Sequence, residues 1–140
     1  MSYRFFEHTA DLGIEVTAPS LDHLLIDCWR ALTDSVTSIE RIESLETRRF
    51  VVEADDLQRL IVDWLSEAIY LFETEGLVFS EVAVRVEQSA AGWRVQATAS
   101  GEPFELQRHG LKTLVKAATY HGIQIGETAQ GWQARLILDL

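Results

Sequence analysis

Residues 55–76, DDLQRLIVDWLSEAIYLFETEG, form the stretch of sequence that decides the fold. Apolar residues recur in it at intervals of three and four, which is typical of an amphipathic helix. Asp55 and Asp56 favour a helix start there, because carboxylates are stabilised near the positive end of the helix dipole. Gly76 is the expected C-cap. The apolar positions are Leu57, Leu60, Ile61, Trp64, Leu65, Ala68, Ile69 and Phe72.

A second helix is predicted at about 20–37, after Pro19 and with Ser20 as its N-cap. Its apolar face includes Cys28, the single cysteine of the chain, which we interpret as a small core residue. The other apolar positions at helical spacing are Leu21, Leu24, Leu25, Trp29, Leu32 and Val36.

The remaining apolar segments alternate with a period of two, which indicates strands. Residues 111–119 are ambiguous, because Leu111, Leu114 and Val115 have helical spacing while Val and Thr also suit a strand; we assign a short helix. Residues 101–110 are expected to be a loop around Pro103. The predicted strands are 3–7, 12–18, 47–54, 78–87, 92–100, 120–126 and 132–138.

These elements predict one α+β domain over residues 1–140. We expect two layers, a mixed or antiparallel sheet with two long helices packed on it. The length of 140 residues fits one domain. No apolar run reaches the roughly 18 residues of a membrane helix, and the first residues lack a signal-peptide core. A lone cysteine cannot form an internal disulfide, so a cytoplasmic location is expected.

Charge is unevenly distributed along the chain, whose net charge is −10. Residues 1–87 contain 7 basic and 18 acidic side chains, whereas residues 88–140 contain 5 basic and 4 acidic ones. Direct nucleic-acid binding needs a larger basic footprint than this. Such an acidic chain suits a cation or a basic protein partner better.

Recognisable catalytic motifs are absent from the sequence. It contains no nucleotide-binding glycine pattern and no paired-cysteine or HExxH zinc signature. No serine or cysteine nucleophile stands in a known motif. The residues themselves therefore give no direct argument for an enzyme.

An oxygen-ligand cation site is the best local candidate. Asp11 lies in a predicted turn at 8–13, Asp139 ends the last strand, and the α-carboxylate of Leu140 follows it. Ca²⁺, Mg²⁺ and Mn²⁺ all prefer several oxygen ligands. The alternative is that Asp11 only stabilises its turn and Asp139 is a solvated strand end.

Five further polar residues are candidates for a secondary site or a partner contact. His8 and His121 flank strand–turn junctions, where each could act as a ligand or proton carrier, or merely cap the turn. Arg108, His109 and Lys116 belong with Lys112 to the small basic group of the chain, in which Arg108 and Lys116 could bind an anion or simply be solvated.

Five segments of the chain, taken in order, resemble archease. The HTAD, TEGL, GEPF and KAxTYHG motifs and the terminal LD are jointly specific, and the resemblance spans essentially the whole chain. The segments are HTADLGIEV (8–16), DWLSEAIYLFETEGLVF (63–79), ASGEPFELQRHG (99–110), VKAATYHGIQI (115–125) and GWQARLILDL (131–140).

The resemblance implies a small cytoplasmic α+β protein that is a cofactor protein and not an enzyme. Archeases assist the GTP-dependent RNA ligase of tRNA splicing and RNA repair, promoting its guanylylation and its multiple turnover. The resemblance also implies a divalent metal site, with calcium the expected ion, at Asp11, Asp139 and Leu140. The resemblance does not exclude Mg²⁺ or Mn²⁺ as the bound ion, and it does not fix the oligomeric state.

Two other functions remain as alternatives. One is a small metal-dependent hydrolase that uses Asp11 and His8. For this function the sequence offers no recognisable pairing of a nucleophile with a general base. The other is a general chaperone or scaffold that uses an apolar surface patch. With so few basic residues, we expect any RNA contact to be indirect.

Overall fold

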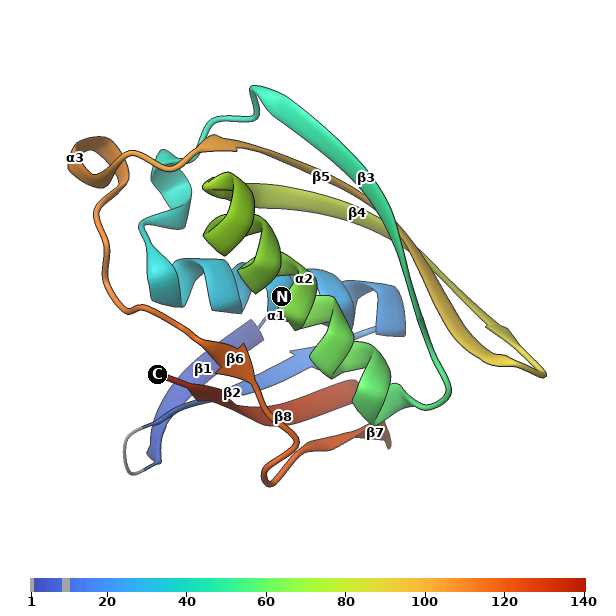
Figure 1. The fold of residues 1–140 in the computed structure, drawn as a ribbon. Coiled ribbons are helices and arrows are strands. Elements are labelled where there is room, and N and C mark those ends of the chain that lie inside the picture. Colours follow the sequence, from blue (N-terminus) through green and yellow to red (C-terminus); the bar gives the residue numbers. More distant parts are fainter. Residues whose placement is uncertain (1, 9–10) are drawn as a thin grey trace.

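The computed structural model describes residues 2–8 and 11–140 of the chain. Its elements alternate strands and helices in an order that puts the first, second and last strands in one sheet (Figure 1). They are β1 (Ser2–His8), β2 (Asp11–Ala18), α1 (Leu21–Val36), the 3-10 turn η1 (Ile39–Arg41), β3 (Glu46–Ala54), α2 (Leu57–Glu75), β4 (Leu77–Ser89), β5 (Gly92–Pro103), α3 (Leu106–His109), β6 (Ala117–Ala118), β7 (Gln124–Thr128) and β8 (Gly131–Asp139).

The strands divide into two antiparallel sheets. The five-stranded sheet has the order β1-β2-β8-β6, with β7 also paired to β8, and the three-stranded sheet has the order β3-β5-β4. Figure 1 shows α1 and α2 between the two sheets, and both helices contact strands of each. The α+β class is therefore confirmed, but two sheets with a helical layer between them replace the expected single sheet under two helices.

The two long helices start and end where the capping residues predict. Ser20 Oγ accepts a hydrogen bond from the His23 N–H at 3.2 Å, and Asp56 Oδ1 accepts one from the Arg59 N–H at 2.8 Å. Gly76 has a φ of 66°, the left-handed conformation that ends α2. These caps satisfy N–H and C=O groups that the helix ends would otherwise leave unpaired.

The core lies between the helices and the sheets, where the faces predicted to be apolar meet. Trp29 of α1 and Trp64 of α2 are fully buried, with ring centroids 4.8 Å apart. Each indole N–H donates to a backbone oxygen, that of Trp29 to Phe79 and that of Trp64 to Leu25. Cys28 is also fully buried, which confirms it as a core residue.

The helix predicted at 111–119 is wrong. Residues 111–116 form neither helix nor strand, and residues 117–118 form β6. The Lys112 N–H donates to the Val36 oxygen and the Lys116 N–H to the Asp139 oxygen, both at 2.8 Å. These tertiary hydrogen bonds replace the local ones that a helix needs. The predicted loop 101–110 contains the end of β5 and the short α3.

Candidate metal site on the five-stranded sheet

Asp11 and Asp139 lie directly opposite each other in the five-stranded sheet. Asp11 begins β2, Asp139 ends β8, and the antiparallel register pairs the two residues. The side chains of a directly opposed pair have their Cβ atoms about 4.5–5.5 Å apart. Two carboxylates that are far apart in the sequence therefore meet at one end of the two inner strands, β2 and β8.

Both carboxylates are on the face of the sheet that points away from the helices. Ile14 and Val16, at alternate positions of β2, are fully buried and face the core. Because side chains alternate along a strand, Asp11 shares the opposite face with Glu15. On β8, Asp139 shares its face with Gln133, Arg135 and Ile137, as the sequence predicted.

On the same outer face, the next polar pair along β2 and β8 has opposite charges. Glu15 pairs in register with Arg135 and contacts its Nε at 3.3 Å. Glu15 also contacts Arg4 of β1 at 2.6 Å. The rung formed by Asp11 and Asp139 is different, because it opposes two negative charges, an arrangement that destabilises a sheet.

A glycine and an aromatic ring separate these two rungs. The ring of Phe6 lies over Gly13, where a Cβ atom would come within 2.1 Å of the Phe6 Cζ. The Arg135 guanidinium lies 4.3 Å from the centroid of the same ring. The absence of a side chain at position 13 thus lets Phe6 and Arg135 cover the middle of this face, beside the carboxylate pair.

Leu140 and Lys116 lie next to the carboxylate pair along the backbone. Leu140 directly follows Asp139, and Ala117 of β6 pairs in register with Asp139. Lys116, which is exposed, precedes Ala117 and its N–H donates to the Asp139 oxygen at 2.8 Å. The structure therefore gathers Asp11, Asp139, Leu140 and Lys116 at one place.

The two candidate histidines lie on different elements, His8 at the end of β1 and His121 in the turn after β6. The backbone of His8 pairs in register with Asp11, but its side chain lies outside what the structure describes, as do Thr9 and Ala10 of the predicted turn. His121 is exposed in the turn after β6, where its N–H donates to Thr119 Oγ1 at 3.3 Å. A role for either imidazole at the carboxylate pair stays a prediction.

Arg108 and His109 lie elsewhere, in a buried cluster around Glu102. The Arg108 guanidinium donates to both carboxylate oxygens of Glu102, at 2.5 and 2.8 Å, while the Glu43 N–H donates to Oε2 at 2.6 Å. His109 Nδ1 accepts the Glu105 N–H at 2.9 Å, so its proton is on Nε2, which lies 3.0 Å from Glu102 Oε2.

The Glu102 cluster is neutralised internally. Glu102 is 1% exposed and His109 is fully buried. The hydrogen bonds from Arg108 lower the pKa of Glu102 to about 2, against the opposing effect of burial. Sequence reasoning missed Glu102 because it stands at the end of a strand predicted to stop earlier. The available signal was an acidic residue followed closely by an Arg-His pair.

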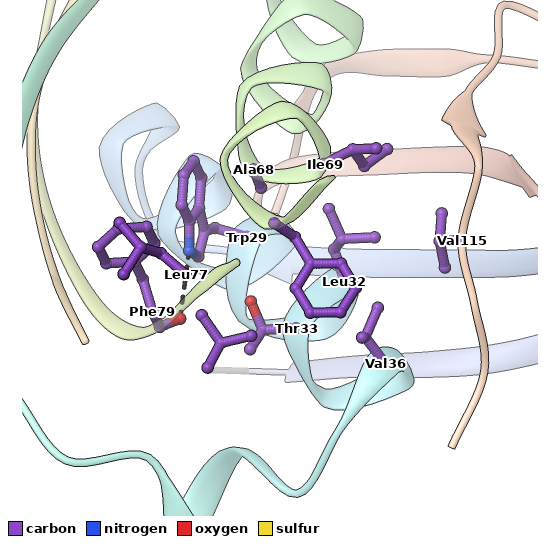
Figure 2. A pocket seen from close by; sticks show the side chains of 11 residues that line it. Trp29, Leu32, Thr33, Val36, Ala68, Ile69, Leu77, Phe79 and Val115 are labelled. Carbon is purple, nitrogen blue, oxygen red and sulfur yellow. Dashed lines mark hydrogen bonds between the residues drawn. The ribbon is translucent and has the colours of Figure 1, made fainter. Parts of the chain in front are cut away.

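An apolar cavity lies among α1, α2 and the start of β4, with Val115 on one side of it (Figure 2). Its volume is about 30 Å³, close to that of a single water molecule. Thr33 is the only polar residue among those that line it, and Val115 closes it on the side of the 110–116 segment. Because its lining offers almost no polar groups, we interpret it as a packing gap.

The donor set at the candidate site is small. Within residues 2–8 and 11–140, no group of three or more His, Cys, Asp or Glu side chains is arranged to hold a metal ion. Among the described residues, Asp11 and Asp139 are the two side-chain carboxylates of the candidate site, and Leu140 is the third ligand that the sequence predicted. Nor does any described helix have the length and apolar character needed to cross a membrane.

Comparison with known proteins places the chain in a known class of small α+β proteins. The family model described as "Archease protein family (MTH1598/TM1083)" matches residues 3–140. The chain belongs to the archease family. Membership of this family supports the role of an accessory protein.

Individual relatives cover the whole chain. It is 35% identical to the protein archease of Methanopyrus kandleri over 100% of both chains. It is 34% identical to that of Pyrococcus abyssi, over 99% of this chain and 98% of the relative. The solution structure of Methanobacterium thermoautotrophicum protein 1598 is 30% identical, with a TM-score of 0.86 over 99% of this chain and 98% of that one.

Proposed function

We propose that this chain activates a GTP-dependent RNA ligase and holds a divalent cation at Asp11, Asp139 and Leu140 while doing so. Activation here means promoting guanylylation of the ligase and its multiple turnover, in tRNA splicing or RNA repair. The observation that carries the proposal is the like-charged rung of Asp11 and Asp139 on the outer face of the five-stranded sheet.

The chemistry of these residues fits a hard cation. Two opposed carboxylates and the backbone oxygen of Leu140 offer oxygen atoms only, which Ca²⁺, Mg²⁺ and Mn²⁺ prefer. A cation bound there supplies positive charge that can interact with phosphate oxygens. Ca²⁺ takes about six to eight oxygen ligands, so a site with three protein ligands leaves room for water or for a partner.

The chain's own residues then have three roles in the proposal. Asp11 and Asp139 bind the ion, and the register of β2 with β8 fixes their separation. Lys116, held beside Asp139 by its backbone N–H, provides a cationic contact for a carboxylate or phosphate. RNA contact is indirect, because the chain as a whole has a net charge of −10.

The test is a ligation assay with the cognate ligase, labelled RNA in excess, and either the native protein or Asp139→Ala. We expect more than one RNA joined per ligase with the native protein and about one with the variant. Gln133→Ala is the matched control, since Gln133 is exposed on the same face of β8. Equal stimulation by Asp139→Ala, or loss of its fold, would overturn the assignment of Asp139.

Metal binding is tested separately by calorimetric titration with Ca²⁺, Mg²⁺ and Mn²⁺. We expect binding by the native protein and by Gln133→Ala, and none by Asp139→Ala. A native protein that stimulates the ligase but binds none of the three ions would remove the metal from the proposal and leave the activation.

A further inference from the structure

Exposed apolar side chains concentrate in one short part of the chain. Among the described residues, eight large hydrophobic side chains are exposed, and four of them fall within residues 106–120. They are Leu106, Leu111, Leu114 and Tyr120, with exposed fractions of 64%, 46%, 51% and 53%. We call Leu111 and Leu114, which lie in the 110–116 segment, the leucine pair.

The backbone that carries the leucine pair is fixed although it has no regular secondary structure. Thr37 Oγ1 donates to the Gly110 oxygen, the Lys112 N–H to the Val36 oxygen and the Lys116 N–H to the Asp139 oxygen. Val115, 3% exposed, anchors the segment to the core at the cavity of Figure 2. The leucine pair is thus exposed on a prearranged surface, which lowers the entropic cost of binding.

Charge around the leucine pair is opposite in sign to that of the chain. Residues 106–120 contain Arg108, Lys112 and Lys116 and no acidic residue, whereas the net charge of the chain is −10. The Arg108 guanidinium is paired with Glu102 and Glu105, so Lys112 and Lys116 are the cations that can face a partner here. Lys112 contacts Asp34 at 3.3 Å but stays 47% exposed, and Lys116 is exposed. A partner that covers this surface therefore needs apolar groups with carboxylates beside them.

We infer that the leucine pair, with Lys112 and Lys116, is the surface by which the chain docks on the ligase protein, on an apolar patch edged by carboxylates. This inference rests on the proposed function. A protein partner suits the surface better than RNA does, because leucines do not stack on bases and two lysines contact few phosphates. Two copies of a chain with net charge −10 repel each other.

Docking here would place the ligase beside the carboxylate pair. Leu114 is two residues before Lys116, whose N–H is bonded to the Asp139 oxygen. Neighbouring residues then have separate functions. The leucine pair determines affinity for the ligase, and Asp11 with Asp139 determines whether the bound protein stimulates it.

The experiment measures binding to the ligase and maximal turnover separately for each variant. Leu111→Asp/Leu114→Asp tests the leucine pair, and Leu111→Ser/Leu114→Ser is the milder version if the first does not fold. Val51→Asp is the matched control, because Val51 of β3 is 46% exposed, as is Leu111, and lies on the three-stranded sheet. Asp139→Ala completes the set.

We expect the leucine variants to bind the ligase at least about tenfold more weakly, as loss of an interface hot spot does, yet to reach native turnover at saturating concentration. Val51→Asp should bind as the native protein does. Asp139→Ala should bind normally and not stimulate. Native affinity in both folded leucine variants, or an equal loss in Val51→Asp, would overturn the inference.

Two further outcomes would also overturn it, each in favour of a different occupant. Direct binding of labelled RNA by the free protein, lost in Lys112→Glu/Lys116→Glu, would assign the surface to RNA. A native dimer in light scattering that the leucine variants convert to monomer would assign it to a second copy. A native protein that neither binds nor stimulates the ligase refutes the proposed function itself, and so is distinct from a failure of the leucine pair alone.

Discussion

The Glu102 cluster and the rung of Asp11 and Asp139 place carboxylates in opposite situations. Glu102 is 1% exposed and is surrounded by donors from Arg108, His109 and the Glu43 backbone. Asp139 is exposed and faces another carboxylate across the ladder. The first site satisfies its charge within the molecule and serves stability. The second opposes two carboxylates across the ladder, and it is the site at which we propose that a cation binds.

The largest expected effect is on the free energy of unfolding, from a substitution in the Glu102 cluster. Glu102→Ala should lower the free energy of unfolding by about 3 kcal/mol, because it leaves His109 and the Glu43 N–H buried without their acceptor. Urea unfolding followed by circular dichroism measures it. Glu105→Ala is the control, since Glu105 also pairs with Arg108 but is 61% exposed, and should cost about 1 kcal/mol or less. Equal losses of unfolding free energy in the two variants would mean that the burial of Glu102 does not increase its contribution to stability.

Acid should remove the contribution of Glu102 selectively. Its pKa in the folded protein is about 2, below the ordinary value of 4.5, so the ionised carboxylate is favoured by folding. The stability that it provides is therefore present above about pH 4.5 and is lost as the pH falls towards 2. The gap in unfolding free energy between the native protein and Glu102→Gln should narrow over that interval. A gap that stays constant down to pH 2 would contradict this account.

Calcium should stabilise the folded protein by binding at Asp11 and Asp139. At about 100 times the dissociation constant, a ligand that binds only the folded state stabilises it by about 2.7 kcal/mol. Thermal unfolding with Ca²⁺ and with a chelator should show this increase in the native protein and in Glu105→Ala. Asp139→Asn should show none. A calcium shift that survives in Asp139→Asn would place the ion elsewhere.

The smallest effect concerns the metal-free protein. With a chelator present, Asp139→Asn should be as stable as the native protein or up to about 0.5 kcal/mol more stable, because it removes a like-charge cross-strand pair. The gain should shrink as salt is added, since ions screen exposed charges. Urea unfolding at two ionic strengths measures both. A clear loss of stability would show that Asp139 is held by favourable interactions, as Glu102 is.

Local sequence patterns predicted most of the elements and half of the candidate site. Alternation in residues 132–138 placed Asp139 on the face of Gln133, Arg135 and Ile137, and the register confirms it. The meeting of Asp139 with Asp11 could not be derived in this way, because it depends on pairing between strands at opposite ends of the chain. The division into two sheets depends on the same long-range pairing.

The segment after α3 shows where local spacing misleads. Leu111, Leu114 and Val115 have the spacing of a helical face, but only Val115 is buried. Hydrogen bonds to Val36 and Asp139 hold the backbone in an irregular path. Apolar spacing predicts a helix only when the apolar side chains share one burial surface, and here two leucines point away from it.

The pairing of β2 with β8 also determines when the carboxylate pair can form during folding. The hairpin of β4 and β5 joins neighbouring segments, whereas β2 and β8 are separated by nearly the whole chain. Closing so long a loop costs entropy before any contact rewards it, so non-local pairing slows folding. β8 must therefore emerge from the ribosome before Asp139 can reach Asp11 and the carboxylate pair can form.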